Sequence, residues 1–187
     1  MCYSAMVFQK YRDFIRQFHA DIGIDEFVRL YLERGSNPAI KIPKGMDANF
    51  LDPQTAEERQ IRDLILHHDR TQAEKWQQDL FKQRKRLADA ERSLQVKVTK
   101  KAESDQRIAT EKVEWLLGKL ADLTRTEPKP RDSRIFPMHY APVMIWEHGR
   151  RVVKPMRYHC RPAGKPVFYD SKYPGCYNAL GAWLTVN

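Results

Sequence analysis

Apolar residues in the first 35 positions recur at spacings of three and four, the period of a helix with one buried face. Gly23 is expected to end the first helix. Asp25 then precedes a second helix over residues 27–32, which Gly35 closes. Residues 36–53 are punctuated by prolines and a glycine, which predicts a loop or extended stretch. The apolar stripe of the first helix consists of Val7, Phe8, Tyr11, Phe14, Ile15 and Phe18.

The next segment has the pattern of a long helical hairpin. Residues 55–94 contain neither proline nor glycine, and three leucines recur at intervals of seven: Leu80, Leu87 and Leu94. A second helical run over residues 104–123 has apolar residues at equivalent spacing, and residues 97–101 are the expected break. At 1.5 Å per residue, the first arm would be about 60 Å long.

Helical periodicity stops after Thr126, where prolines, β-branched residues and aromatics take over. Residues 143–146, the turn-like Glu147-His148-Gly149 and the residues from Val152 onward predict a β-hairpin. The chain is therefore expected to have an α+β fold in three parts. Residues 1–53 and 125–187 would form one mixed domain, and residues 54–124 would be a helical insertion.

The formal net charge of +9 favours a polyanionic partner, either nucleic acid or an anionic membrane surface, although a solvated basic surface gives the same number. Residues 125–172 contain eleven Lys/Arg against four Asp/Glu, interleaved with aromatic residues. Such a surface suits single-stranded DNA, because cations follow phosphates and rings stack on bases. About half of these aromatics should be core, because a strand buries one face. They are Tyr140, Trp146, Tyr158, Phe168 and Tyr169.

The helical segment is basic as well. Residues 69–101 contain ten Lys/Arg against five Asp/Glu. This excess fits the solvated outer face of a helical arm, and it also permits phosphate contact.

Targeting and redox features point to the cytoplasm. No apolar run is long enough to span a bilayer, and the N-terminus lacks the pattern of a secretory signal. Three cysteines, Cys2, Cys160 and Cys176, are too few for a disulfide framework. Neighbouring histidines (His139, His148 and His159) suggest zinc, but their spacing matches no paired ligand motif, so no metal or cofactor is predicted.

Cys2 carries the most specific chemistry. Removal of the initiator methionine would give a terminal cysteine whose α-amine and thiol are both partly deprotonated near neutral pH. A 1,2-aminothiol condenses with an aldehyde to a thiazolidine, and an opened abasic site in DNA presents such an aldehyde. The same free amine could instead belong to an N-terminal-nucleophile hydrolase.

Three short motifs, in order, resemble the SRAP family, the SOS-response-associated peptidases that crosslink abasic sites in DNA. They are MCYSA at 1–5, HYAPVMIW at 139–146, and YNA at 177–179 after the proline-rich residues 152–170. The resemblance covers about 60 residues plus the N-terminus. It implies a mixed β-barrel that receives single-stranded DNA, with Cys2 as the nucleophile and Asn178 as a hydrogen-bonding residue. Residues 54–124 would be an insertion relative to shorter members.

The resemblance and the basic surface together imply a DNA damage response protein with peptidase-type or lyase-type activity and no cofactor. The expected DNA contacts are Tyr140, Pro142, Arg157, Arg161 and Lys165. Tyr3 and Ser4 replace the family's Gly-Arg, so an arginine expected near DNA is missing.

The match stops at Ala179, and the sequence given ends at Asn187, nine residues after Asn178. The family's later glutamate and histidine are not found, which favours a truncated or frameshifted product. The remaining acids, Glu147 and Asp170, lie beside a turn and a proline-rich loop, where solvated side chains are expected. The alternatives are a non-catalytic nucleic-acid-binding or coiled-coil interaction protein and a cysteine hydrolase acting on small amides.

Overall fold

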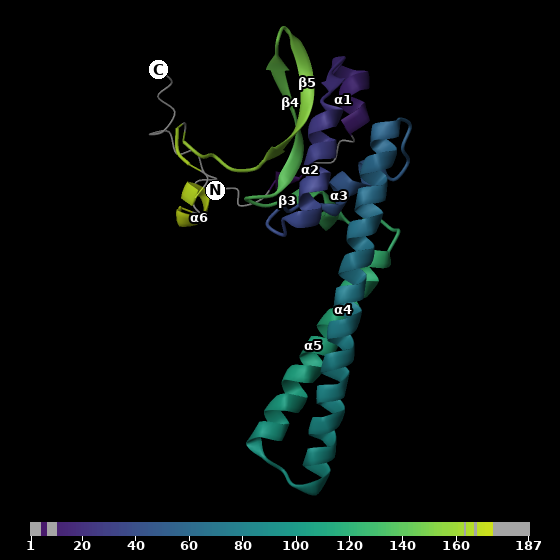
Figure 1. Ribbon diagram of the computed structural model, residues 1–187, viewed down its shortest axis with the longest axis vertical. Coiled ribbons are helices and arrows are strands. Elements are labelled where there is room, and N and C mark those ends of the chain that lie inside the picture. Colours follow the sequence, from purple (N-terminus) through teal and green to yellow (C-terminus); the bar gives the residue numbers. More distant parts are fainter. Residues whose placement is uncertain (1–4, 7–10, 163, 167, 174–187) are drawn as a thin grey trace. The chain divides into compact units, whose positions relative to one another are not determined.

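The computed structural model describes residues 5–6, 11–162, 164–166 and 168–173. The chain divides into two compact units, residues 1–65 with 128–187 and residues 66–127. Figure 1 shows the ribbon and labels helices α1 to α6 and strands β3, β4 and β5. The fold is mixed α+β, as the sequence predicts.

The N-terminal part of the first unit is more helical than predicted. It contains α1 (Tyr11–Phe18), β2 (Asp21–Ile22), α2 (Ile24–Ser36), α3 (Lys44–Asp47) and the 3-10 turn η1 (Ala48–Phe50). The first helix ends at Phe18 rather than at Gly23, because the chain enters β2 before it reaches the glycine. Gly35 lies inside α2 instead of closing it. The predicted loop over 36–53 contains α3, which begins after Pro43, a residue whose fixed φ suits a helix start.

The core of this unit is built around Phe50, which is fully buried. Its ring stacks on Tyr11 at 5.1 Å and contacts Phe27 and Tyr31 at 5.6 and 5.5 Å between centroids. Helix α4 (Ala56–Val96) contributes Ile61 and Ile65 from its first turns, and β5 contributes Val153. The apolar stripe predicted for the first helix is partly confirmed, because Tyr11 is buried while Ile15 and Phe18 are exposed.

Two small sheets complete the unit. In one, β1 (Ala5–Met6) pairs antiparallel with β3 (Arg134–Ile135), which follows the 3-10 turn η2 (Pro130–Ser133). In the other, the order is β2-β5-β4, with β4 (Tyr140–Glu147) antiparallel and β2 parallel to β5 (Arg150–Arg157). The strands of the described residues do not close into a barrel.

The predicted β-hairpin is confirmed and starts earlier than expected, at Tyr140. His148 and Gly149 both have positive φ, 50° and 78°. A two-residue type I′ turn requires positive φ at both central residues, and its twist matches that of the flanking strands. Pro142 faces Pro155 across the hairpin. Proline has no N–H to donate, so this pair must occupy a position without ladder hydrogen bonds.

The second unit is a helical hairpin. Helix α4 continues into it from the first unit, and α5 (Lys100–Thr124) returns after a three-residue break. Thr99 caps α5 by accepting a hydrogen bond from the Ala102 N–H at 3.2 Å. Arg86 on α4 pairs with Asp105 on α5 at 2.6 Å. The side chains buried in this hairpin are mostly small: Ala90, Ala102, Ala109 and Leu116.

Candidate nucleic-acid interface

The end of β5 and the chain that follows it gather charged side chains around Asp170, on the short helix α6 (Phe168–Lys172). Arg157, the last residue of β5, donates a hydrogen bond to Asp170 Oδ2. Arg161 Nη1 lies 3.6 Å from the same oxygen. His159 Nε2 lies 3.1 Å from Oδ1, although this contact is not aligned as a hydrogen bond. One carboxylate therefore contacts three basic side chains, and we name these four residues the Asp170 cluster.

Burial divides the Asp170 cluster into an inner and an outer pair. The side chains of Asp170 and His159 are 3% and 2% exposed, whereas those of Arg157 and Arg161 are 28% and 31% exposed. The expectation of a solvated Asp170 is wrong, because β5 and the segment after it cover the carboxylate. A buried carboxylate is stable only when it is paired, and the arginines supply the pairing.

Exposed groups next to the Asp170 cluster extend its basic and aromatic character. Lys165 is exposed, and its Nζ lies 6.0 Å from the centre of the Tyr169 ring. Phe168 is also largely exposed, at 64%. Three cations and an exposed ring thus lie in one short stretch of chain, which is the combination expected for a single-strand surface.

The structure places Tyr140 opposite Arg157 across β4 and β5. Tyr140 is partly buried and packs against the core, so part of its surface is unavailable to a ligand. Pro142 is buried and offers no side-chain surface, which removes it from the expected contacts. Pro142 lies on β4, an edge strand of the three-stranded sheet, and faces Pro155 on the central strand β5.

The turn end of the hairpin presents a second basic and aromatic group. Trp146 is 69% exposed, and the Arg151 guanidinium lies 5.9 Å from its ring centre. Between the two ends, Lys154 pairs with Glu147 at 2.5 Å and with Glu26 at 3.1 Å. The hydrogen bond from Lys154 lowers the pKa of Glu147, so this acid is paired rather than available. The sequence pattern identified Trp146 as part of a basic region but gave no sign of its pairing with Arg151.

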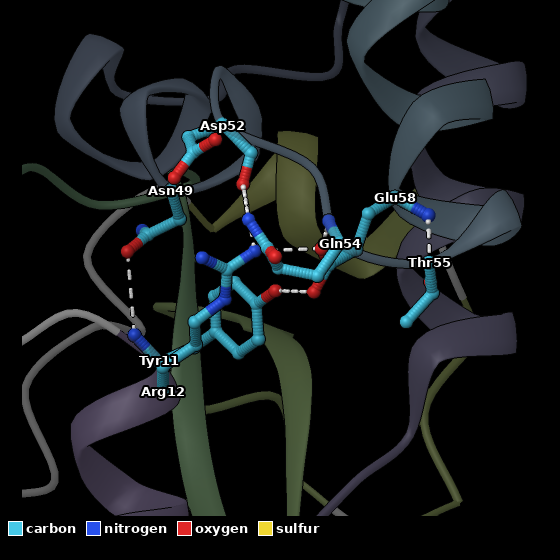
Figure 2. A network of polar contacts seen from close by, with 7 residues as sticks. All are labelled: Tyr11, Arg12, Asn49, Asp52, Gln54, Thr55 and Glu58. Carbon is cyan, nitrogen blue, oxygen red and sulfur yellow. Dashed lines mark hydrogen bonds and ion pairs between the residues drawn. The ribbon is translucent and has the colours of Figure 1, made fainter.

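A separate polar network joins α1 to the start of α4 (Figure 2). Glu58 accepts hydrogen bonds from the Tyr11 hydroxyl, from Arg12 Nη2 at 2.6 Å and from the Gln54 N–H at 2.6 Å. Burial alone would raise the pKa of Glu58, but these hydrogen bonds outweigh it and hold the pKa below its usual range. Thr55 caps α4 by accepting a hydrogen bond from the Glu58 N–H. These contacts connect α1 with the first turn of α4.

The two predicted catalytic residues, Cys2 and Asn178, lie outside the described residues, as does Cys176. Cys160 is exposed beside the Asp170 cluster. Within the described part of the chain, no group of three or more His, Cys, Asp or Glu side chains could hold a metal ion. No helix in that part has the length and apolar content to cross a bilayer.

Comparison with known proteins gives no family for this chain. It matches no protein-family profile, no curated protein and no solved structure.

Proposed function

We propose that this chain binds single-stranded DNA and that Cys2 attaches covalently to abasic sites, in the manner of the SRAP family that its motifs resemble. The complete fold would be the mixed barrel of that family, with residues 66–127 as part of an inserted hairpin. The proposed role is in the DNA damage response, with lyase-type or peptidase-type chemistry at the same residue.

The observation that carries the proposal is the pairing of β1 with β3, Ala5 with Ile135 and Met6 with Arg134. Ala5 follows Cys2 by three residues, and β3 leads into β4, so the segment after Cys2 joins the unit that contains the Asp170 cluster. A nucleophile and a phosphate-binding surface are both needed to capture a site in DNA. The pairing of Ala5 and Met6 with β3 connects the segment after Cys2 to the unit that contains the Asp170 cluster, and this supports the proposal.

The proposed reaction uses both groups of the terminal cysteine. The α-amine attacks the aldehyde carbon of the opened abasic site, and loss of water gives an imine. The thiol sulfur then adds to the imine carbon while its proton passes to the nitrogen, which closes the thiazolidine. The atoms balance with water as the sole by-product, and no oxidant or reductant is required.

Binding can be tested with matched pairs of neutralised cations. Arg161→Gln with Lys165→Gln removes two charges beside Asp170, and Arg84→Gln with Lys85→Gln removes two exposed charges from α4. Affinity for a single-stranded oligonucleotide should fall steeply with salt, because neutralised phosphates release counterions. The first pair should weaken binding about tenfold or more, and the second pair much less. Equal effects would place the DNA on the hairpin, and salt-independent binding would remove the basic-surface argument.

A second candidate is protein interaction through the hairpin, which the exposed apolar side chains of the second unit favour. Phe81 on α4 and Trp115 and Leu117 on α5 are exposed. Sedimentation of the wild-type chain and of the Phe81→Ser and Trp115→Ser variants tests self-association. A wild-type oligomer that these changes dissociate supports this role, and a monomeric wild type removes self-association as the function.

A further inference from the structure

We propose that Asp170 is a positioning residue that holds Arg157 and Arg161 together as one binding site for a phosphodiester of single-stranded DNA. The inference rests on the proposed function and deepens it, because it identifies the phosphate-binding group and the buried residue that assembles it.

The position of Asp170 explains how the two arginine side chains can lie close together. Two guanidinium groups repel each other, and each is always charged. Asp170 Oδ2 contacts both Arg157 and Arg161, so a single carboxylate offsets that repulsion. Because Asp170 is buried, it fixes the arginines from the inner side and leaves their outer parts exposed.

The unused capacity of the arginines points to an anionic ligand. A guanidinium has five N–H donors. Among the described residues, Arg157 donates one hydrogen bond, to Asp170, and the buried Nη1 of Arg161 makes none. Arg157 and Arg161 carry two positive charges and Asp170 carries one negative charge, so one positive charge is not offset within this group. Lys165, which is exposed, adds another positive charge nearby. A phosphodiester has one negative charge and oxygen acceptors that suit paired guanidinium groups.

His159 contacts Asp170, but the burial of both side chains argues against proton transfer to a ligand. The His159 side chain is 2% exposed, and neither of its nitrogens makes a hydrogen bond to the described residues. A reacting group in solution would not reach it. His159 Nε2 lies 3.1 Å from Asp170 Oδ1, on the buried side of the Asp170 cluster.

The test is Asp170→Asn, which removes a negative charge while keeping the size of the side chain. Bulk electrostatics predicts tighter binding of DNA by this more positive variant. The proposal predicts the opposite: about tenfold weaker binding to oligothymidylate of about 15 nucleotides, and a salt slope smaller by about one. Asp21→Asn is the matched control, since Asp21 is an exposed carboxylate on β2 that pairs at 3.0 Å with Arg150, the first residue of β5. It should leave affinity unchanged or increase it.

Binding by Asp170→Asn that equals or exceeds binding by the wild type would overturn the inference. If Asp170→Asn shows no cooperative thermal transition, Arg157→Lys and Arg161→Lys decide the question, because each keeps the charge and loses the planar fork. Each should weaken binding several-fold, and wild-type affinity in both would overturn the inference. Failure of the wild type to bind single-stranded DNA would refute the proposed function and the inference together. Normal wild-type binding with unaffected variants would refute the inference alone.

Discussion

The hydroxyl of Tyr11 donates a hydrogen bond to the carboxylate of Glu58, 47 positions later in the chain. The contact joins the first turn of α1 to the first turn of α4, and both residues are buried. Burial and this hydrogen bond raise the pKa of Tyr11, which keeps the phenol protonated as a donor.

Tyr11→Phe should therefore lower the free energy of unfolding by about 1–2 kcal/mol, because Glu58 loses one of its donors while the ring stays in the core. Urea denaturation measures the change. Tyr173→Phe removes a hydroxyl from an exposed residue and should change stability by less than about 0.5 kcal/mol. Equal effects of the two substitutions would show that the Tyr11–Glu58 contact contributes nothing specific.

Glu58 should also make stability depend on pH. Its folded pKa lies below its unfolded value, so its contribution is present above the unfolded value of about 4.3 and is lost as pH falls through the folded pKa. Glu58→Gln should be less stable at neutral pH and show a shallower loss of melting temperature on acidification below about pH 4.5. A parallel loss in wild type and variant would contradict the assigned pKa direction.

Phe50 gives a direct test of the core. It contacts three other rings and is fully buried, so Phe50→Ala should cost about 3–5 kcal/mol in chemical denaturation. Phe81→Ala, at an exposed position of α4, is the control and should cost less than about 1 kcal/mol. A small loss at Phe50 would mean that the ring cluster is not the centre of this unit.

Two glycines should respond with opposite signs to alanine. Gly149 has a φ of 78° in the hairpin turn, where alanine is strained, so Gly149→Ala should destabilise by about 1 kcal/mol. Gly118 lies within α5, and no neighbouring atom lies within 4 Å of an added methyl group. Gly118→Ala should stabilise by about 0.5–1 kcal/mol. Thermal unfolding of both variants measures the signs, and matching signs would contradict the backbone argument.

Periodicity in the sequence predicted the parts of the fold that local pattern determines. The long helices around Leu80 and Leu116 and the hairpin turn at Gly149 are examples, because spacing and turn chemistry act over a few residues. Helix α3 was missed, because Pro43 and Gly45 indicate a loop locally while burial of Met46 and Phe50 favours a compact turn. Tertiary packing therefore outweighed local preference there.

The candidate interface was predictable in composition but not in geometry. The density of Arg and Lys after β5 indicated a basic surface, and Arg157, Arg161 and Lys165 do lie in one stretch of chain. Asp170 was expected to be solvated, because nothing in the neighbouring sequence shows that α6 brings its carboxylate under β5. The partners of a buried charge come from distant elements, and a single sequence does not reveal them.

Capture of abasic sites by Cys2 can be tested by detecting the covalent adduct itself. Wild type, Cys2→Ala and Cys160→Ala are each incubated with single-stranded DNA that contains one abasic site, and adducts are separated on a denaturing gel. Cys160 is the matched control because it is an exposed cysteine beside the proposed DNA surface. Capture by Cys2 predicts a stable adduct with wild type and Cys160→Ala, and none with Cys2→Ala. An adduct that survives Cys2→Ala, or the absence of any adduct with wild type whose initiator methionine is shown by intact mass to be removed, would contradict it.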